Sequence, residues 1–310
     1  MVARQGHGAI VVGVGPHGLA PGTISLVVEA AEHLGLNIEL VHVLPTPDAW
    51  PSGLVETGVA LVELAKAGRA ALASAADLVR AEAGTSRGIS ARLVHDGVVP
   101  GLVDHGRHAR LLVLERHDHS RWERALTGET IARIAAHAET PVVSVPAGWL
   151  PSQRTLPITV GCEDADRAAA ELWTALGLAA ATDRPVRVVR VTYLPQAYQE
   201  ILRREVRQRD FLDATRHELA RDAALPAEVC EGVGCQFEAR WGRPSEVLVE
   251  LSSSSSLIVL ARRDPRLPIG SHLGPVVREV LRASRCPVMV VEPTLREPVR
   301  LAERRHAAAV

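Results

Sequence analysis

Hydrophobic and polar positions follow two alternating patterns along the chain. Short, nearly continuous runs of β-branched residues, such as residues 9–14 and 156–162, are typical of strands buried on both faces. Ala- and Leu-rich stretches, such as residues 23–34 and 165–178, place apolar side chains every three or four positions and predict helices. Because strand and helix alternate throughout, right-handed crossovers should give parallel sheets with helices on both faces.

The same series of elements occurs twice. The predicted strands cover residues 9–14, 38–43, 89–94, 111–114 and 141–145, and again 156–162, 186–191, 235–240, 257–260 and 287–291. Long second helices are predicted at 54–83 and 197–224, and final helices at 128–138 and 275–283. A Pro/Gly-rich stretch at 146–151 separates the copies. We therefore expect α/β domains over residues 1–148 and 152–294, each doubly wound, followed by a tail at 295–310.

Composition limits the classes of function. A chain of 310 residues is too long for one ordinary core, which agrees with two domains. A formal charge of −1 gives no basic face for nucleic acid or an anionic membrane surface. No stretch approaches the ~20 apolar residues of a membrane span, and the N-terminus has no apolar signal core. We expect a cytoplasmic protein, and the four cysteines, which form no C-x-x-C pair, to be reduced.

One low-complexity run stands before the fourth strand of the second half. Ser252–Ser256 is five consecutive serines, at the place of a bend in the first half. The run predicts a solvated turn.

Four motifs together resemble the universal stress protein family. They are Ile-Val-Val-Gly-Val at 10–14, Val-His-Val at 41–43, Gly242-Arg-Pro244, and Cys-Pro-Val-Met-Val-Val at 286–291. The resemblance runs from about residue 8 to 292, in two copies. It implies flavodoxin/Rossmann-like units with five parallel strands in the order 3-2-1-4-5, and a non-catalytic role in stress response or signalling.

The resemblance also implies how the copies meet. Fifth strands of this family often pair between subunits, and the apolar edges at 141–145 and 287–291 would otherwise be exposed. We expect an internal pseudo-dimer through these strands, with a homodimer and an unknown protein partner as further possibilities.

Members that bind ATP share a loop, G-x-x-G-x₉-G-[ST], after the fourth strand. Glycines let backbone N–H groups approach phosphate, and the final pair opens a helix whose N-terminus favours anions. The four motif positions read Glu115, Asp118, Gly128 and Glu129 in the first half, and Ala261, Asp264, Gly274 and Pro275 in the second. A carboxylate ~4 Å from a phosphate costs about 1–4 kcal/mol, or roughly tenfold to a thousandfold in affinity. The sequence thus predicts loss of tight ATP binding, unless Mg²⁺ or the arginines at 116, 262 and 263 offset the charge.

The residues of a vestigial nucleotide site can still be named from the resemblance. They are Gly15, Val43, Asp118 and Gly128 in the first half, and Glu163, Val191, Ala261, Asp264 and Gly274 in the second. Gly15 and Glu163 stand where ATP-binding members have an aspartate beside the adenine. Glu163 is the milder change, so the second half is the better candidate. We expect no cofactor, with ATP or another adenine nucleotide in the second half as the alternative.

Three other patterns could carry chemistry: a glycine-rich turn, a group of histidines and a loop serine. Gly13-Val-Gly-Pro-His-Gly18 matches the dinucleotide fingerprint, but the second strand ends without a ribose-binding carboxylate and Pro16 stiffens the turn. A glycine-rich turn without a nicotinamide or flavin cofactor is favoured.

Histidines gather at 105, 108, 117, 119 and 137, and His117 and His119 can point the same way. Because a third metal ligand is not evident, surface histidines are favoured. Ser271 lies in no G-x-S-x-G elbow, so an enzyme is not expected.

Overall fold

The computed structural model describes residues 8–46, 58–84, 88–117, 126–163, 168–193, 208–223, 232–263 and 273–293. Its strands are β1 (Ala9–Gly13), β2 (Ile38–Leu44), β3 (Ile89–His95), β4 (Ala109–Arg116), β5 (Val142–Pro146), β6 (Ile158–Gly161), β7 (Val186–Thr192), β8 (Cys235–Trp241), β9 (Leu257–Ala261) and β10 (Val288–Val291). Its α-helices are α1 (Pro21–Leu34), α2 (Gly58–Ala83), α3 (Val98–Gly106), α4 (Gly128–His137), α5 (Ala169–Thr182), α7 (Gln208–Asp222), α9 (Pro244–Leu251) and α10 (Pro275–Ala283), with 3₁₀ turns at Pro151–Thr155 and Ser252–Ser254.

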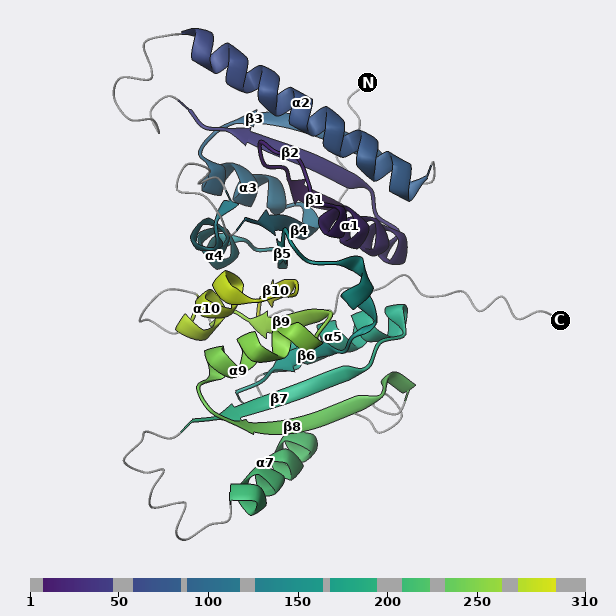
Figure 1. Ribbon diagram of the computed structural model, residues 1–310, viewed down its shortest axis with the longest axis vertical. Helices are drawn as coiled ribbons and strands as arrows, with labels where there is room; N and C mark the ends of the chain where they lie inside the picture. Colours follow the sequence, from purple (N-terminus) through teal and green to yellow (C-terminus); the bar gives the residue numbers. More distant parts are fainter. Residues whose placement is uncertain are drawn as a thin grey trace, which may run out of the picture.

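All ten strands form one sheet in the order β3-β2-β1-β4-β5-β10-β9-β6-β7-β8 (Figure 1). Within each half the order is 3-2-1-4-5 and neighbouring strands pair parallel. The predicted fold class is confirmed. None of the helices in the described part of the chain is both long and apolar enough to cross a membrane.

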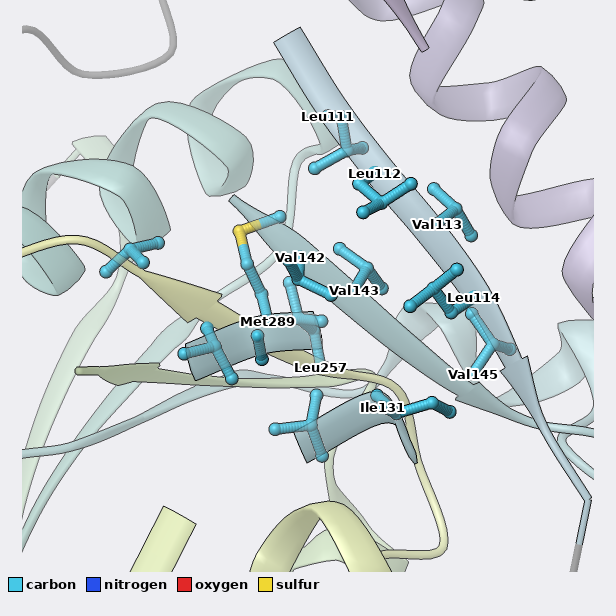
Figure 2. Packing of buried hydrophobic residues seen from close by; sticks show 14 of the residues in the cluster. Leu111, Leu112, Val113, Leu114, Ile131, Val142, Val143, Val145, Leu257 and Met289 are labelled. Carbon is cyan, nitrogen blue, oxygen red and sulfur yellow. The ribbon is translucent and has the colours of Figure 1, made fainter. Parts of the chain in front are cut away.

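The two halves join through their fifth strands. β5 and β10 pair antiparallel, with Met289 opposite Val143. The predicted internal pairing is confirmed, and it turns two five-stranded sheets into one. Figure 2 shows β4 and β5 side chains such as Leu112 and Val143 lying with Met289 of β10 and Ile131 of α4. One hydrophobic cluster includes all four of these residues, so the core continues across the seam.

The register lets positions in the two halves be equated. Ile10 pairs with Leu111 in the first half, as Ile158 pairs with Leu257 in the second. The first helices α1 and α5 both end at a left-handed residue, Gly35 with φ 68° and Asp183 with φ 53°. Thr23 is therefore equivalent to Glu171, Glu115 to Ala261, Arg116 to Arg262, and Gly128 to Gly274.

Two expectations need correction. The helix predicted to end at residue 178 continues to Thr182, because Ala179–Ala181 are strong helix formers. The solvated serine turn holds only for Ser253 and Ser254, which are exposed, whereas Ser252, Ser255 and Ser256 are buried. Ser255 Oγ lies 2.7 Å from Leu251 O and 2.8 Å from Thr159 Oγ1. These hydrogen bonds satisfy the serine hydroxyl inside the protein, so it does not need water. Residues 54–57 and 197–207 of the predicted long helices lie outside the described residues.

Candidate functional site

A small cavity lies at the carboxyl ends of β1 and β2 in the first half. Its lining includes Gly15, Pro16, Val43, Leu102 and Leu126, so the structure brings together two residues of the predicted site, Gly15 and Val43. The space open to the centre of a water-sized sphere is about 20 Å³. That volume holds a water molecule or two.

His42, from the Val-His-Val motif, forms one wall of this cavity. Its Nδ1 lies 2.8 Å from Val14 O, and the ring is buried. On its other side α2 comes so close that a Cβ on Gly68 would lie 2.6 Å from His42 Cδ2. The histidine therefore holds the end of β1 against β2 and α2.

Glu115 provides a fixed negative charge next to the cavity. The residue is 2% exposed, and its Oε2 accepts hydrogen bonds from Ala20 N at 2.7 Å and Thr23 Oγ1 at 2.5 Å. Ala20 directly precedes α1, so the carboxylate lies at the positive end of that helix. Oε1 lies 3.1 Å from His117 Nε2. The position equivalent to the loop's first glycine thus carries an anion bound by the protein itself.

Gly128 faces the other half of the molecule. A Cβ there would lie 3.1 Å from Arg282 Cα of α10, so only glycine allows this approach of the two helices without a shift. Glu129 next to it lies 3.7 Å from Arg278 of α10. The nearest neighbours of Gly128 therefore belong to α10, whereas Gly15 and Val43 line the cavity.

The second half keeps a more open arrangement of its predicted residues. Glu163 is exposed just after β6, while Val191 near the end of β7 and Ala261 at the end of β9 are half-buried. Gly274 is buried and directly precedes α10, and the position of its absent Cβ lies 3.2 Å from Arg263 Nε. A guanidinium is therefore close to a helix N-terminus, where an anion is favoured. Asp118 and Asp264 lie outside the described residues.

Glu171 is a buried acid that sequence analysis missed. It occupies the first turn of α5 and is 6% exposed. Burial raises its pKa from 4.5 to about 7, against a smaller lowering by a backbone hydrogen bond. Its Oε2 is buried and has no hydrogen-bond partner among the described residues. A glutamate in a first helical turn is typical of an exposed N-terminus. Only its equivalence with Thr23, opposite the end of the fourth strand, could have indicated a buried position.

Comparison with known proteins decides the family. The model of the universal stress protein family matches residues 7–146 and 154–292, one match in each half. The chain belongs to this family. Universal stress proteins Mb2028c of Mycobacterium bovis and Rv2005c of Mycobacterium tuberculosis are each 28% identical over 231 residues, which cover 72% of this chain and 76% of theirs.

Solved structures share the fold of this universal stress protein. A universal stress protein from Archaeoglobus fulgidus is similar with a TM-score of 0.61 and 13% identity, over 92% of this chain and 97% of its own. Protein PA1789 of Pseudomonas aeruginosa is similar with a TM-score of 0.57 and 15% identity, over 92% of both chains.

Two loop arginines of this universal stress protein bind carbonyl groups across the seam. Arg116 is 3% exposed, and its Nη1 and Nη2 donate to Leu281 O at 2.7 Å and Ser284 O at 2.6 Å. Arg262 Nη1 donates to Ala136 O at 3.3 Å. From the sequence, both arginines could offset the charge of the loop carboxylates near a phosphate. Their guanidinium groups instead hold the ends of helices from the opposite half.

The other sequence patterns give no second site in the described residues. Gly18 N donates to Gly15 O at 3.1 Å, and the Glu115 carboxylate lies at the N-terminus of α1 where a dinucleotide's pyrophosphate would bind. His105 and His137 bond to carbonyls of their own helices, and no group of three metal-ligating residues occurs in the described ranges. His119 and Ser271 lie outside them.

Proposed function

We propose that this universal stress protein is a non-catalytic, cytoplasmic module of stress response or signalling that does not bind ATP tightly. Its two domains would be residues 1–148 and 152–294. A further copy of the chain or another protein would be its partner. The observation that carries the proposal is the Glu115 carboxylate, bound to Ala20 N and Thr23 Oγ1 where ATP-binding members have glycine.

Electrostatics support this proposal for the first half. A phosphate approaching this loop would meet a buried anion that two donors hold in place. Arg116 is the nearest arginine in sequence, and its guanidinium bonds to Leu281 O and Ser284 O. Moving Arg116 to a phosphate would give up both bonds.

A second candidate function is binding of an adenine nucleotide in the second half. Gly274 and Arg263 at the start of α10 favour an anion, and the alanine at position 261 brings no charge. Glu163 would take the place of the aspartate beside the adenine. This candidate makes the second half a nucleotide switch.

Nucleotide content distinguishes the two candidates. The full chain is purified, denatured, and its supernatant separated by chromatography, and the native protein is titrated with ATP by calorimetry with and without Mg²⁺. We expect no stoichiometric nucleotide and no saturable binding at physiological ATP concentration. Stoichiometric adenine nucleotide would overturn the first proposal. If that binding is lost in Arg263→Met, the second half holds the site.

A further inference from the structure

Helices α4 and α10 lie side by side across the seam between the halves (Figure 1). Each begins at the loop that follows the fourth strand of its own half, α4 at Gly128 and α10 directly after Gly274. Each ends at an arginine from the corresponding loop of the other half. Arg116 binds Leu281 O and Ser284 O at the end of α10, and Arg262 binds Ala136 O near the end of α4.

These contacts satisfy groups that a helix leaves open. The last carbonyls of a helix have no partner within it and carry the negative end of its dipole. A guanidinium presents several N–H donors in a fixed plane, so Arg116 can bind two carbonyls at once. Because Arg116 is 3% exposed, moving the end of α10 would leave a buried cation without these acceptors.

The two contacts differ in strength. Arg116 makes bonds of 2.7 and 2.6 Å to the other half, whereas Arg262 makes one of 3.3 Å. Arg262 also lies 3.3 Å from Glu292 of its own half, which divides its contacts between the halves. The stronger connection therefore runs through α10, from Gly274 at one end to Arg116 at the other.

We propose that α10 couples the two halves, so that a change at Gly274 in the second half alters the position of Arg116 in the first. The helix is nine residues long, or about 14 Å, short enough to move as one rigid element. The first half would respond to events at the second-half loop without binding a ligand itself.

Coupling of this kind needs two places that respond together. The near end is the segment Leu281–Ser284 that Arg116 binds. The far end is the amide of Arg278, which donates to Gly274 O at 3.1 Å in the first turn of α10. If Arg116 only caps the end of α10, its loss should change amide exchange at the near end and leave Arg278 unchanged.

Amide hydrogen exchange in the full chain tests the proposal. In Arg116→Met we expect several-fold faster exchange at the end of α10 and also at Arg278. Arg116→Lys keeps the charge and loses the planar pair of donors, so it should give a smaller change at both places. The matched control is Arg285→Met, because Arg285 lies just beyond α10 and bonds to Ser253 of its own half.

Two results would contradict the coupling. Unchanged exchange at Arg278 beside faster exchange at the end of α10 would overturn the coupling, and so would an equal effect of Arg285→Met. If Arg116→Met does not fold, exchange in Arg116→Lys is compared with wild type at the same two places, the end of α10 and the Arg278 amide. The measurement uses no ligand, so its result stands whether or not the second half takes a nucleotide.

Discussion

Each half places one carboxylate where its first helix meets its fourth strand. The carboxylate belongs to the strand in the first half and to the helix in the second. In the first half the acid is Glu115 on β4, and the facing residue on α1 is Thr23. In the second half the acid is Glu171 on α5, and the strand position is Ala261. Glu115 has two donors and a nearby histidine, whereas one buried oxygen of Glu171 has no partner in the part of the chain that the structure describes. The same fold position thus holds a bound anion in one half and an acid that titrates near neutral pH in the other.

The largest effect is expected from removing the first carboxylate. Glu115→Ala leaves the buried Thr23 hydroxyl and the half-buried Ala20 N–H without an acceptor. At roughly 2 kcal/mol for each, the free energy of unfolding should fall by about 4 kcal/mol in urea denaturation. Thr23→Val removes one of the two bonds and should cost about half as much. An unfolding free energy for Glu115→Ala equal to that of the wild type would show that the charge is not held as described.

A pH-dependent effect of somewhat smaller size is expected from Glu171. Its pKa is about 7 in the folded protein against 4.5 for a free glutamate, so folding favours its protonated form. The stability that Glu171 contributes is complete below pH 4.5 and is lost as pH rises through 7. Relative to Glu171→Gln, which does not titrate, the wild type should lose about 3 kcal/mol over that range.

Glu171→Thr sharpens this comparison by giving the second half the residue of the first. It should be as insensitive to pH as the glutamine variant and more stable than the wild type at pH 8. A constant difference between wild type and Glu171→Gln from pH 4.5 to 8 would mean that Glu171 finds a partner in solution.

Replacing the last glycine of the loop by alanine should destabilise the first half more than the second. A Cβ at Gly128 would lie 3.1 Å from the backbone of Arg282, whereas at Gly274 it would meet the Arg263 side chain at 3.2 Å. Backbone must shift in the first case, and a flexible side chain can move in the second. We expect Gly128→Ala to lower the thermal stability by about 1–2 kcal/mol and Gly274→Ala by less than about 0.5 kcal/mol. Equal losses would mean that α4 and α10 approach less closely than described.

Local pattern was enough to predict most of the fold and only part of the site. Buried β-branched runs fix which segments are strands, and apolar edges at the fifth strands predicted their pairing. Gly15 and Val43 meet because parallel strands end at one edge of a sheet. The partners of Arg116 and the burial of Glu171 depend on which distant segments pack together. A residue's own neighbours in sequence do not carry that information, so both were missed.

The smallest effect concerns a cross-strand ion pair that is reversed between the halves. Glu39 on β2 lies 3.0 Å from Arg92 on β3, while the equivalent residues Arg187 and Glu238 lie 3.3 Å apart with opposite signs. The first pair is partly exposed and should contribute less than about 1 kcal/mol. Glu39→Arg should cost about that much through like charges, and the double variant with Arg92→Glu should recover most of it.

The corresponding exchange in the second half should recover less. Arg187 also donates to Ser254 Oγ at 3.1 Å, and a glutamate at 187 has no N–H to make this bond. Double-mutant cycles in urea measure both coupling energies. Full recovery in both halves would show that Ser254 contributes nothing to the placement of Arg187, and that only the sign of the pair differs between the two halves.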